Sequence, residues 1–226
     1  MGDLQQQALL ELQDLSCIRD DRPLFQGLSA TLNPGEIWRI EGPNGAGKTT
    51  LIRLICGLFS NFEGKILYQG EDLATNRYQF ATNVLFIGHK TGIKPSLTAE
   101  ENLRWMSGLR ASYSQQEIFA ALAQVGLRGY EDLPAYSLSA GQQRRIALAR
   151  LYLESAPFWI LDEPFTAIDF NGVAQLEQRL GEHAAKGGTV LLTTHHELSI
   201  AGQEVRPLRL QGTPAVNLKT NGSHNE

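Results

Sequence analysis

A glycine-rich stretch at residues 42–49 has the residue types and spacing of a phosphate-binding loop. It matches the pattern of glycine, four residues, then glycine, lysine and serine or threonine without a mismatch. Glycines let backbone N–H groups converge on phosphate oxygens at a helix N-terminus, while Lys48 supplies positive charge and the Thr49 hydroxyl suits Mg²⁺. The residues predicted to bind the nucleotide here are Gly42, Pro43, Asn44, Gly45, Ala46, Gly47, Lys48, Thr49 and Thr50.

Two adjacent acids, Asp162 and Glu163, follow directly on the apolar residues 158–161. Burial of that segment as a strand places Asp162 at its tip, facing a metal ion, and Glu163 one step further, where it can polarise a water molecule. Neighbouring carboxylates repel each other without a cation, so the pair implies Mg²⁺. By themselves, Asp-Glu-Pro residues would also suit a surface turn.

A third stretch predicts a helix whose N-terminus can receive an anion. Ser139 is followed three residues later by Gln142, which is the spacing of a capping box. The free N–H groups and the positive dipole end of such a helix suit a γ-phosphate. Arg144 and Arg145 lie further along this helix, and we expect them to be solvated or structural ion partners rather than ligands.

The fourth stretch is Thr193-Thr194-His195, and a second histidine, His196, follows it directly. A neutral imidazole both donates and accepts hydrogen bonds, so either histidine could contact a phosphate and the attacking water. The remaining histidines outside the motifs, His183 and His224, are expected to be ordinary surface residues.

Four predicted strands position these stretches, because each strand ends at a motif. Apolar runs at 37–40, 84–87, 158–161 and 190–193 alternate with helical stretches such as 49–58, a pattern typical of an α/β fold with a mostly parallel sheet. Such sheets bind ligands outside the carboxyl ends of their strands, so one shared site is expected.

A helix-rich block, residues 97–154, lies between the second and third of these strands. Thr98 and Ser114 each precede a glutamate by three residues, so each fits a capping box. We interpret the block as a helical subdomain inserted into a single domain that spans residues 1–226. The polar residues 217–226 are predicted to form a loose tail.

The composition limits the classes of partner. The chain has 226 residues, of which 42% are hydrophobic and 19% charged, and its formal net charge of −4 gives no support for nucleic acid as a partner. Cys17 and Cys56 lie outside any metal-ligand spacing, which predicts free thiols. The sequence contains no secretory signal in residues 1–7 and no apolar run of the roughly 20 residues that span a bilayer. Work at a membrane would therefore need another chain for the membrane part.

The four motifs together resemble those of the ABC ATPases, whose signature is Leu-Ser-x-Gly-Gln. The resemblance implies a P-loop fold with a mostly parallel core sheet, an N-terminal antiparallel β region and an inserted helical subdomain. In that family the signature faces the nucleotide of a second ATPase domain, so a head-to-tail homodimer is implied, with Asp169 in the loop that senses the opposite site. The signature residues are Leu138, Ser139, Ala140, Gly141 and Gln142.

The resemblance also implies ATP and Mg²⁺ as the cofactors. When the Thr194-His195 pair is aligned with the family pattern, His195 and not His196 takes the place of the histidine at the γ-phosphate. The residues that match the family pattern are Lys48, Glu163 and His195 for catalysis, and Thr49 and Asp162 for the metal.

Two positions depart from the family pattern. His89 stands where most ABC ATPases have a glutamine, and an imidazole is shorter and titratable, so its contact with Mg²⁺ or water stays open. Arg19 stands where an aromatic residue normally stacks on adenine. A guanidinium can stack on a base, and plain exposure to solvent is the alternative.

Flanking residues resemble those of one branch, the CcmA family of bacterial cytochrome c maturation systems. The matching segments are Gly-His-x-x-Gly-Ile-Lys from residue 88 and Leu-Asp-Glu-Pro-Phe-Thr-Ala-Ile-Asp from residue 161. The resemblance implies a peripheral subunit on the cytoplasmic face of the inner membrane, with integral membrane subunits of the CcmB and CcmC type as partners. ATP hydrolysis would drive haem export or release of a haem-loaded chaperone, with haem handled by the partners.

Three other functions fit the same motifs. One is a soluble ABC ATPase that acts on ribosomes or DNA, although the chain has neither a second ATPase half nor a long coiled coil. Another is a scaffold that barely hydrolyses ATP, and the third is a transporter subunit for a different cargo. The residues 89–105 are the expected coupling surface to membrane subunits, because they join the nucleotide site to the helical block.

Overall fold

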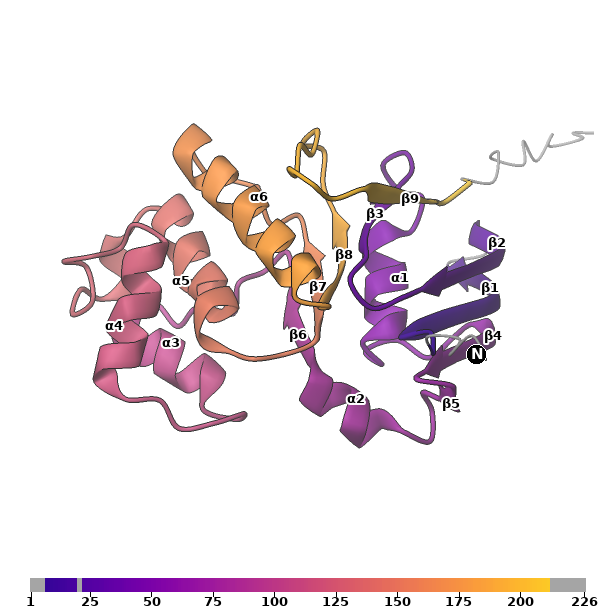
Figure 1. Ribbon diagram of the computed structural model, residues 1–226, viewed down its shortest axis with the longest axis horizontal. Helices are drawn as coiled ribbons and strands as arrows, with labels where there is room; N and C mark the ends of the chain where they lie inside the picture. Colours follow the sequence, from indigo (N-terminus) through magenta and orange to yellow (C-terminus); the bar gives the residue numbers. More distant parts are fainter. Residues whose placement is uncertain (1–6, 20–21, 212–226) are drawn as a thin grey trace, which may run out of the picture.

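The computed structural model describes residues 7–19 and 22–211, and in this part of the chain nine strands form two sheets (Figure 1). The predicted tail, residues 217–226, lies outside the described residues. The strands are β1 (Leu10–Arg19), β2 (Arg22–Leu32), β3 (Ile37–Glu41), β4 (Glu63–Tyr68), β5 (Glu71–Asp72), β6 (Val84–Ile87), β7 (Phe158–Asp162), β8 (Thr189–Thr193) and β9 (Val205–Arg209). The α-helices are α1 (Lys48–Ile55), α2 (Arg77–Asn83), α3 (Ala99–Ser107), α4 (Gln115–Gln124), α5 (Ala140–Leu153) and α6 (Phe170–Ala185).

The larger sheet is parallel and has the strand order β6-β7-β8-β3-β9. Every residue of β7 and β8 is buried, as expected for strands covered on both faces. Because side chains alternate along a strand, Trp159 and Leu161 enter the core on one face, while Phe158 and Ile160 enter the core on the other. The predicted parallel α/β sheet is confirmed.

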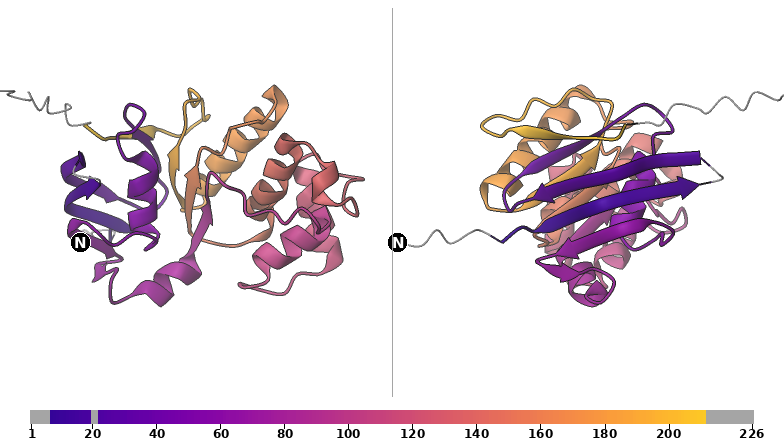
Figure 2. Two further views of the ribbon diagram at one scale, coloured as in Figure 1. Left: turned by 180° about the vertical axis from the view of Figure 1, so that it is seen from behind. Right: turned by 90° about the vertical axis from the view of Figure 1, so that its right-hand side faces the viewer.

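The smaller sheet is antiparallel, with the order β2-β1-β4-β5, and it confirms the antiparallel β region near the N-terminus. Helix α1 lies between the two sheets (Figure 1). Its buried Leu51 and Ile52 share one core with Leu12 and Phe25 of the antiparallel sheet and with Leu191 of β8. The antiparallel sheet therefore covers the face of the parallel sheet on which α1 packs (Figure 2).

Helices α3, α4, α5 and α6 cover the opposite face of the parallel sheet (Figures 1 and 2). Capping boxes begin α3 at Thr98, α4 at Ser114 and α5 at Ser139, as the sequence predicts. Gly108 caps the C-terminus of α3, while Gly126, just beyond α4, has a φ of 73°. In the described ranges, no helix has the length and apolar character needed to cross a membrane.

Candidate active site

The glycine-rich stretch forms a loop between β3 and α1, so its backbone N–H groups lie at a helix N-terminus. Gly47 caps α1 with a φ of 95°, and a Cβ at this position would lie 3.0 Å from the Cβ of Leu24, so the turn requires glycine. The first turn of α1 leaves N–H groups without intrahelical acceptors. The Lys48 ammonium donates to the carbonyls of Gly42, at 2.7 Å, and Pro43, at 3.3 Å. Free donors and a cation therefore meet in one loop, which suits phosphate.

The Asp162 carboxylate lies at the end of β7 and is 3% exposed. Its Oδ1 accepts a hydrogen bond from Thr193 Oγ1 at 2.7 Å and lies 3.4 Å from Thr49 Oγ1. The fold thus brings together the two residues predicted to hold Mg²⁺. The sequence places Thr193 in the fourth stretch but assigns no contact to its hydroxyl, although a hydroxyl at a strand end within a motif was an available signal.

Glu163 follows Asp162 in a left-handed conformation, with a φ of 52°. This conformation is strained for a residue with a Cβ, and such strain persists only where neighbours hold it. Two acceptors on Thr193 hold the Glu163 amide, its carbonyl at 3.2 Å and its Oγ1 at 2.9 Å. The backbone is therefore held in a sharp turn directly after β7.

The two neighbouring histidines have different surroundings. His195 Nε2 lies 3.5 Å from Glu163 Oε1, and the His195 side chain is 68% exposed. His196 Nε2 instead lies 3.2 Å from Glu177 Oε1, and its ring lies 5.0 Å from the ring of Phe165. Glu163 therefore has His195 as its histidine neighbour, while His196 pairs with helix α6.

The two arginines of α5 also differ, and the expectation of a solvated residue or an ion partner is wrong for Arg144. Arg144 is 5% exposed, and its guanidinium donates to backbone carbonyls at the ends of β6 and β7 instead of to a carboxylate. Arg145 does form an ion pair, with Asp169. The Gly172 amide and then Arg145 hold the pKa of the Asp169 carboxyl below its usual value.

The signature residues occupy the N-terminus of α5. Ser139 Oγ accepts from the Gln142 amide at 3.2 Å, and Gln142 Oε1 accepts from the Ser139 amide at 2.9 Å. A Cβ on Gly141 would lie 2.5 Å from the Ala167 carbonyl oxygen, so glycine lets this helix approach the loop that follows Glu163. The signature is therefore packed against the loop that follows Glu163.

Comparison with known proteins places the chain in a family. The sequence profile of the ABC transporter family matches residues 25–166. The chain belongs to the ABC transporter family. A relative from Hahella chejuensis, the cytochrome c biogenesis ATP-binding export protein CcmA, is 53% identical, with 91% of this chain and 97% of the relative covered. This match bears out the branch that the sequence motifs predicted.

Two solved ABC proteins have the same fold. A putative ABC transporter ATP-binding protein from Pyrococcus furiosus superposes with a TM-score of 0.76 at 27% identity and covers 89% of this chain and 96% of its own. An ATP-binding cassette solved as a dimer with ADP and Pi in a post-hydrolysis state has a TM-score of 0.70 at 23% identity and covers 83% of this chain and 88% of its own.

The oxygen atoms of Thr49 and Asp162 suit Mg²⁺, the ion that ABC ATPases use with ATP. In the described residues, no group of three or more histidines, cysteines or acids is arranged to enclose a metal by itself. Mg²⁺ prefers one or two protein oxygens together with waters and phosphates. The Thr49 hydroxyl and the Asp162 carboxylate supply those oxygens beside the phosphate loop, so the residues fit the ion.

The two departures from the ABC pattern lie at exposed positions. His89 is exposed on the loop after β6, and its carbonyl accepts from Arg144 at 3.3 Å. Arg19 is the exposed last residue of β1 and lies opposite Arg22 of β2. Their roles toward a nucleotide stay predictions.

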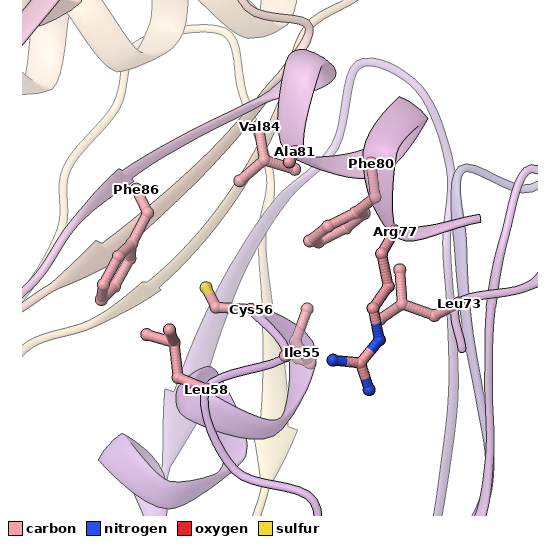
Figure 3. Close-up of a pocket in the computed structure, with 10 residues that line it drawn as sticks. Ile55, Cys56, Leu58, Leu73, Arg77, Phe80, Ala81, Val84 and Phe86 are labelled. Carbon is pink, nitrogen blue, oxygen red and sulfur yellow. The ribbon is translucent and has the colours of Figure 1, made fainter. Parts of the chain in front are cut away.

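A separate hollow of about 290 Å³ lies where the end of α1 meets α2 and β6 (Figure 3). Its walls are mainly apolar, and the side chains include those of Leu58, Phe80, Phe86, Arg77 and Cys56. Burial, and then the Asp162 carboxylate, raise the pKa of the Cys56 thiol to about 12, so this cysteine stays protonated at neutral pH. Cys17 is free as well, as the sequence predicts.

Proposed function

We propose that this ABC protein binds ATP with Mg²⁺ and hydrolyses it to ADP and phosphate at the carboxyl ends of β3, β7 and β8. The observation that supports this most directly is the proximity of Thr49, Asp162 and Thr193, with Glu163 and His195 beside them. These side chains come from α1, from β7 and the residue after it, and from β8 and the residues after it, and they meet at the shared site that the sequence predicts.

Positioning and charge carry most of the catalysis in phosphoryl transfer. In the proposed site, Lys48 and the loop amides bind the β- and γ-phosphates, and Thr49 and Asp162 would hold Mg²⁺, which neutralises phosphate charge. Glu163 polarises the attacking water, and the exposed His195 ring orients it and contacts the γ-phosphate. The strained turn at Glu163 supports this role, since strained residues persist where neighbours hold them, and the Glu163 carboxylate lies 3.5 Å from His195 Nε2.

We also propose that two copies of the chain bind two ATP molecules between them. Helix α1 and helix α5 pack on opposite faces of the parallel sheet, so the signature at the start of α5 suits a nucleotide held by another copy (Figure 1). The solved cassette dimer with ADP and Pi provides a precedent in this fold. Asp169, held by Arg145, would lie in the loop that senses the opposite site.

The proposed setting is a c-type cytochrome biogenesis complex, as the CcmA relative's name indicates for that protein. There the chain would be a peripheral subunit at the cytoplasmic face of the inner membrane, bound to integral subunits of the CcmB and CcmC type. Hydrolysis would drive haem export or release of a haem-loaded chaperone. The segment 89–105 remains the proposed coupling surface, and its Trp105 is 56% exposed.

Replacing Glu163 with Gln tests the hydrolysis mechanism. The amide keeps the shape of the side chain but is a poor base, so phosphate release should fall by about 100-fold or more. ATP binding should persist, and the ATP-loaded variant should elute as a stable dimer in size-exclusion chromatography. The exposed Glu197, changed to Gln, is the matched control. Turnover equal to that of the control would disprove the assignment of Glu163.

Co-expression with and without the membrane subunits tests the setting. We expect the tagged chain to co-purify with them from detergent-solubilised membranes and its ATPase rate to change on assembly. Full activity with no co-purification would favour a soluble ABC ATPase, and co-purification with different membrane proteins would favour another cargo.

A further inference from the structure

We propose that Arg144 is a positioning residue that fixes Glu163 and ties the hydrolysis site to the signature helix of the same chain. This inference rests on the proposed hydrolysis at Glu163. The guanidinium donates to Gly88 and Asp162 carbonyls at 2.8 and 2.9 Å, to Glu163 at 2.9 Å and to His89 at 3.3 Å. One side chain thus joins two loops that both border the site.

The strand order explains why one arginine can reach both loops. β6 and β7 are parallel neighbours, with Ile87 opposite Leu161, so the residues that follow each strand emerge side by side. A guanidinium is planar and carries five N–H donors in a fixed fork, which suits four carbonyls on two chain segments. A lysine ammonium at the same position has a single donor centre and cannot span them in the same way.

Arg144 completes the restraint on the strained residue. The Glu163 amide donates to Thr193, and the Glu163 carbonyl accepts from Arg144, so both backbone polar groups of Glu163 are held. A left-handed conformation at a residue with a Cβ relaxes when its restraints are lost. The Thr166 amide also donates to the Glu163 carbonyl, at 3.3 Å. Removing the shorter Arg144 contact therefore weakens, but does not abolish, the restraint on the peptide that aims the proposed base.

The position of Arg144 on α5 connects it with the other half of the proposed dimer. Ser139, the N-cap of this helix, lies five residues before Arg144, about 7.5 Å along the helix axis. A phosphate that binds at the N-terminus of α5 would contact the same rigid element that holds Glu163. Arg144 thus links the signature helix, which serves the partner's ATP, directly to the backbone of the base that serves its own.

Two other arginines, Arg110 and Arg150, also donate to backbone carbonyls at this edge of the sheet, but within the described part of the chain they have no contact with the proposed site. β6 is the edge strand, and arginines donate to the carbonyls of alternate residues along it and just after it. The pairs are Arg110 with Val84, Arg150 with Phe86, and Arg144 with Gly88. Arg110 and Arg150 also pair with the buried Glu154. Of the three arginines, only Arg144 donates to the carbonyls of Asp162 and Glu163.

The test replaces Arg144 by Lys and by Gln in the full chain, with Arg150→Lys as the matched control. ATP affinity and KM should stay within about 3-fold, because the phosphate loop does not contact Arg144, whereas kcat should fall about 100-fold through misplacement of Glu163. Arg150→Lys should keep kcat within about 2-fold, since the lysine retains a partner in Glu154.

A double variant separates positioning from general damage. If Arg144 acts through Glu163, adding Arg144→Lys to Glu163→Gln should lower the single-turnover rate no further than Glu163→Gln alone. A multiplicative loss would overturn the inference, as would a kcat for both Arg144 variants equal to that of Arg150→Lys. Loss of ATP binding in both Arg144 variants would also overturn it, in favour of a role in folding. Unchanged turnover in Glu163→Gln itself would instead sink the proposed function.

Discussion

The phosphate loop and the signature region are both helix N-termini that offer N–H groups to an anion, yet their surroundings differ. At the phosphate loop, the start of α1 carries the Lys48 cation and the Thr49 hydroxyl, which lies 3.4 Å from the Asp162 carboxylate, and these oxygens suit a metal ion. At the signature, the Ser139 side chain caps its own helix, and Gly141 packs under the loop after Glu163. We call the first region the cradle, because it combines N–H donors with a cation and carboxylate and hydroxyl oxygens. We call the second region the donor set, because it offers N–H donors on the opposite face of the sheet.

The difference shows that a motif specifies which N–H groups are available, but not which bound nucleotide they contact. Two similar helix ends have similar dipoles and free amides. What distinguishes them is whether other strands bring charge to the same place. In this chain, β7 and β8 bring their polar ends to the phosphate loop, which is why we assign the signature to a nucleotide bound by a second copy.

The largest expected effect comes from changing one residue in each region. Lys48→Ala removes the cation over the phosphates and should weaken ATP binding by about 100-fold. Gly141→Ala should leave ATP affinity within about 2-fold and lower turnover by about 100-fold, because the new Cβ would lie 2.5 Å from the Ala167 carbonyl oxygen and displace the signature. A fluorescent ATP analogue measures affinity, and phosphate release measures turnover.

The exposed Lys65, changed to Ala, controls for loss of a surface charge in that experiment. If Gly141→Ala weakened ATP binding as strongly as Lys48→Ala, the two regions would belong to one site within the chain. The contrast between cradle and donor set would then be wrong.

An intermediate effect is expected from the two neighbouring histidines. His195→Ala should reduce turnover by about 10- to 100-fold with little change in the free energy of unfolding, because its exposed ring has Glu163 as its partner. His196→Ala should keep turnover within about 2-fold but lower stability by about 1 kcal/mol, because it loses Glu177 and the Phe165 ring. Denaturant unfolding and phosphate release on both variants check this. The reverse pattern would assign the site to His196.

The smallest effect is expected at His183, which belongs neither to the phosphate loop nor to the signature region. His183 is not the ordinary surface residue that its sequence context predicts, because its ring stacks on Trp159 at 3.6 Å. Burial, with the nearby Arg179 cation, lowers the His183 pKa to about 4. The unfolded chain, with an ordinary pKa of 6.5, therefore binds more protons than the folded chain between these values.

Stability from His183 should thus be complete above pH 6.5 and decline as the pH falls toward 4. Urea unfolding at pH 7 and pH 5 should show a larger drop for the native chain than for His183→Gln, by about 1 kcal/mol after allowance for the partial exposure of the ring. Equal drops in the two proteins would contradict the assignment. Turnover at pH 7 should be the same in both.

Much of the fold follows from local patterns. The strand at 84–87 and the three capping boxes appear where the sequence predicts them, since alternation, apolar runs and a serine or threonine three residues before Glu or Gln are local signals. The spacing of the glycines likewise predicted the loop between β3 and α1. Errors arose where the environment depends on distant residues, as for His183, which stacks on a tryptophan from another element, and for Arg144.

The sequence by itself determined the kinds of chemistry present, the order of the strands along the chain and the family, because motif spacing and hydrophobic period are properties of short segments. Only the tertiary structure decided which side chains meet. Thr193 reaches Asp162 across 31 residues, and Arg144 reaches the Gly88 carbonyl across 56. Such contacts depend on the pairing of β6, β7 and β8 and on the packing of α5 against the sheet. The free energy that fixes them is shared by the whole core, so no single stretch of residues specifies them.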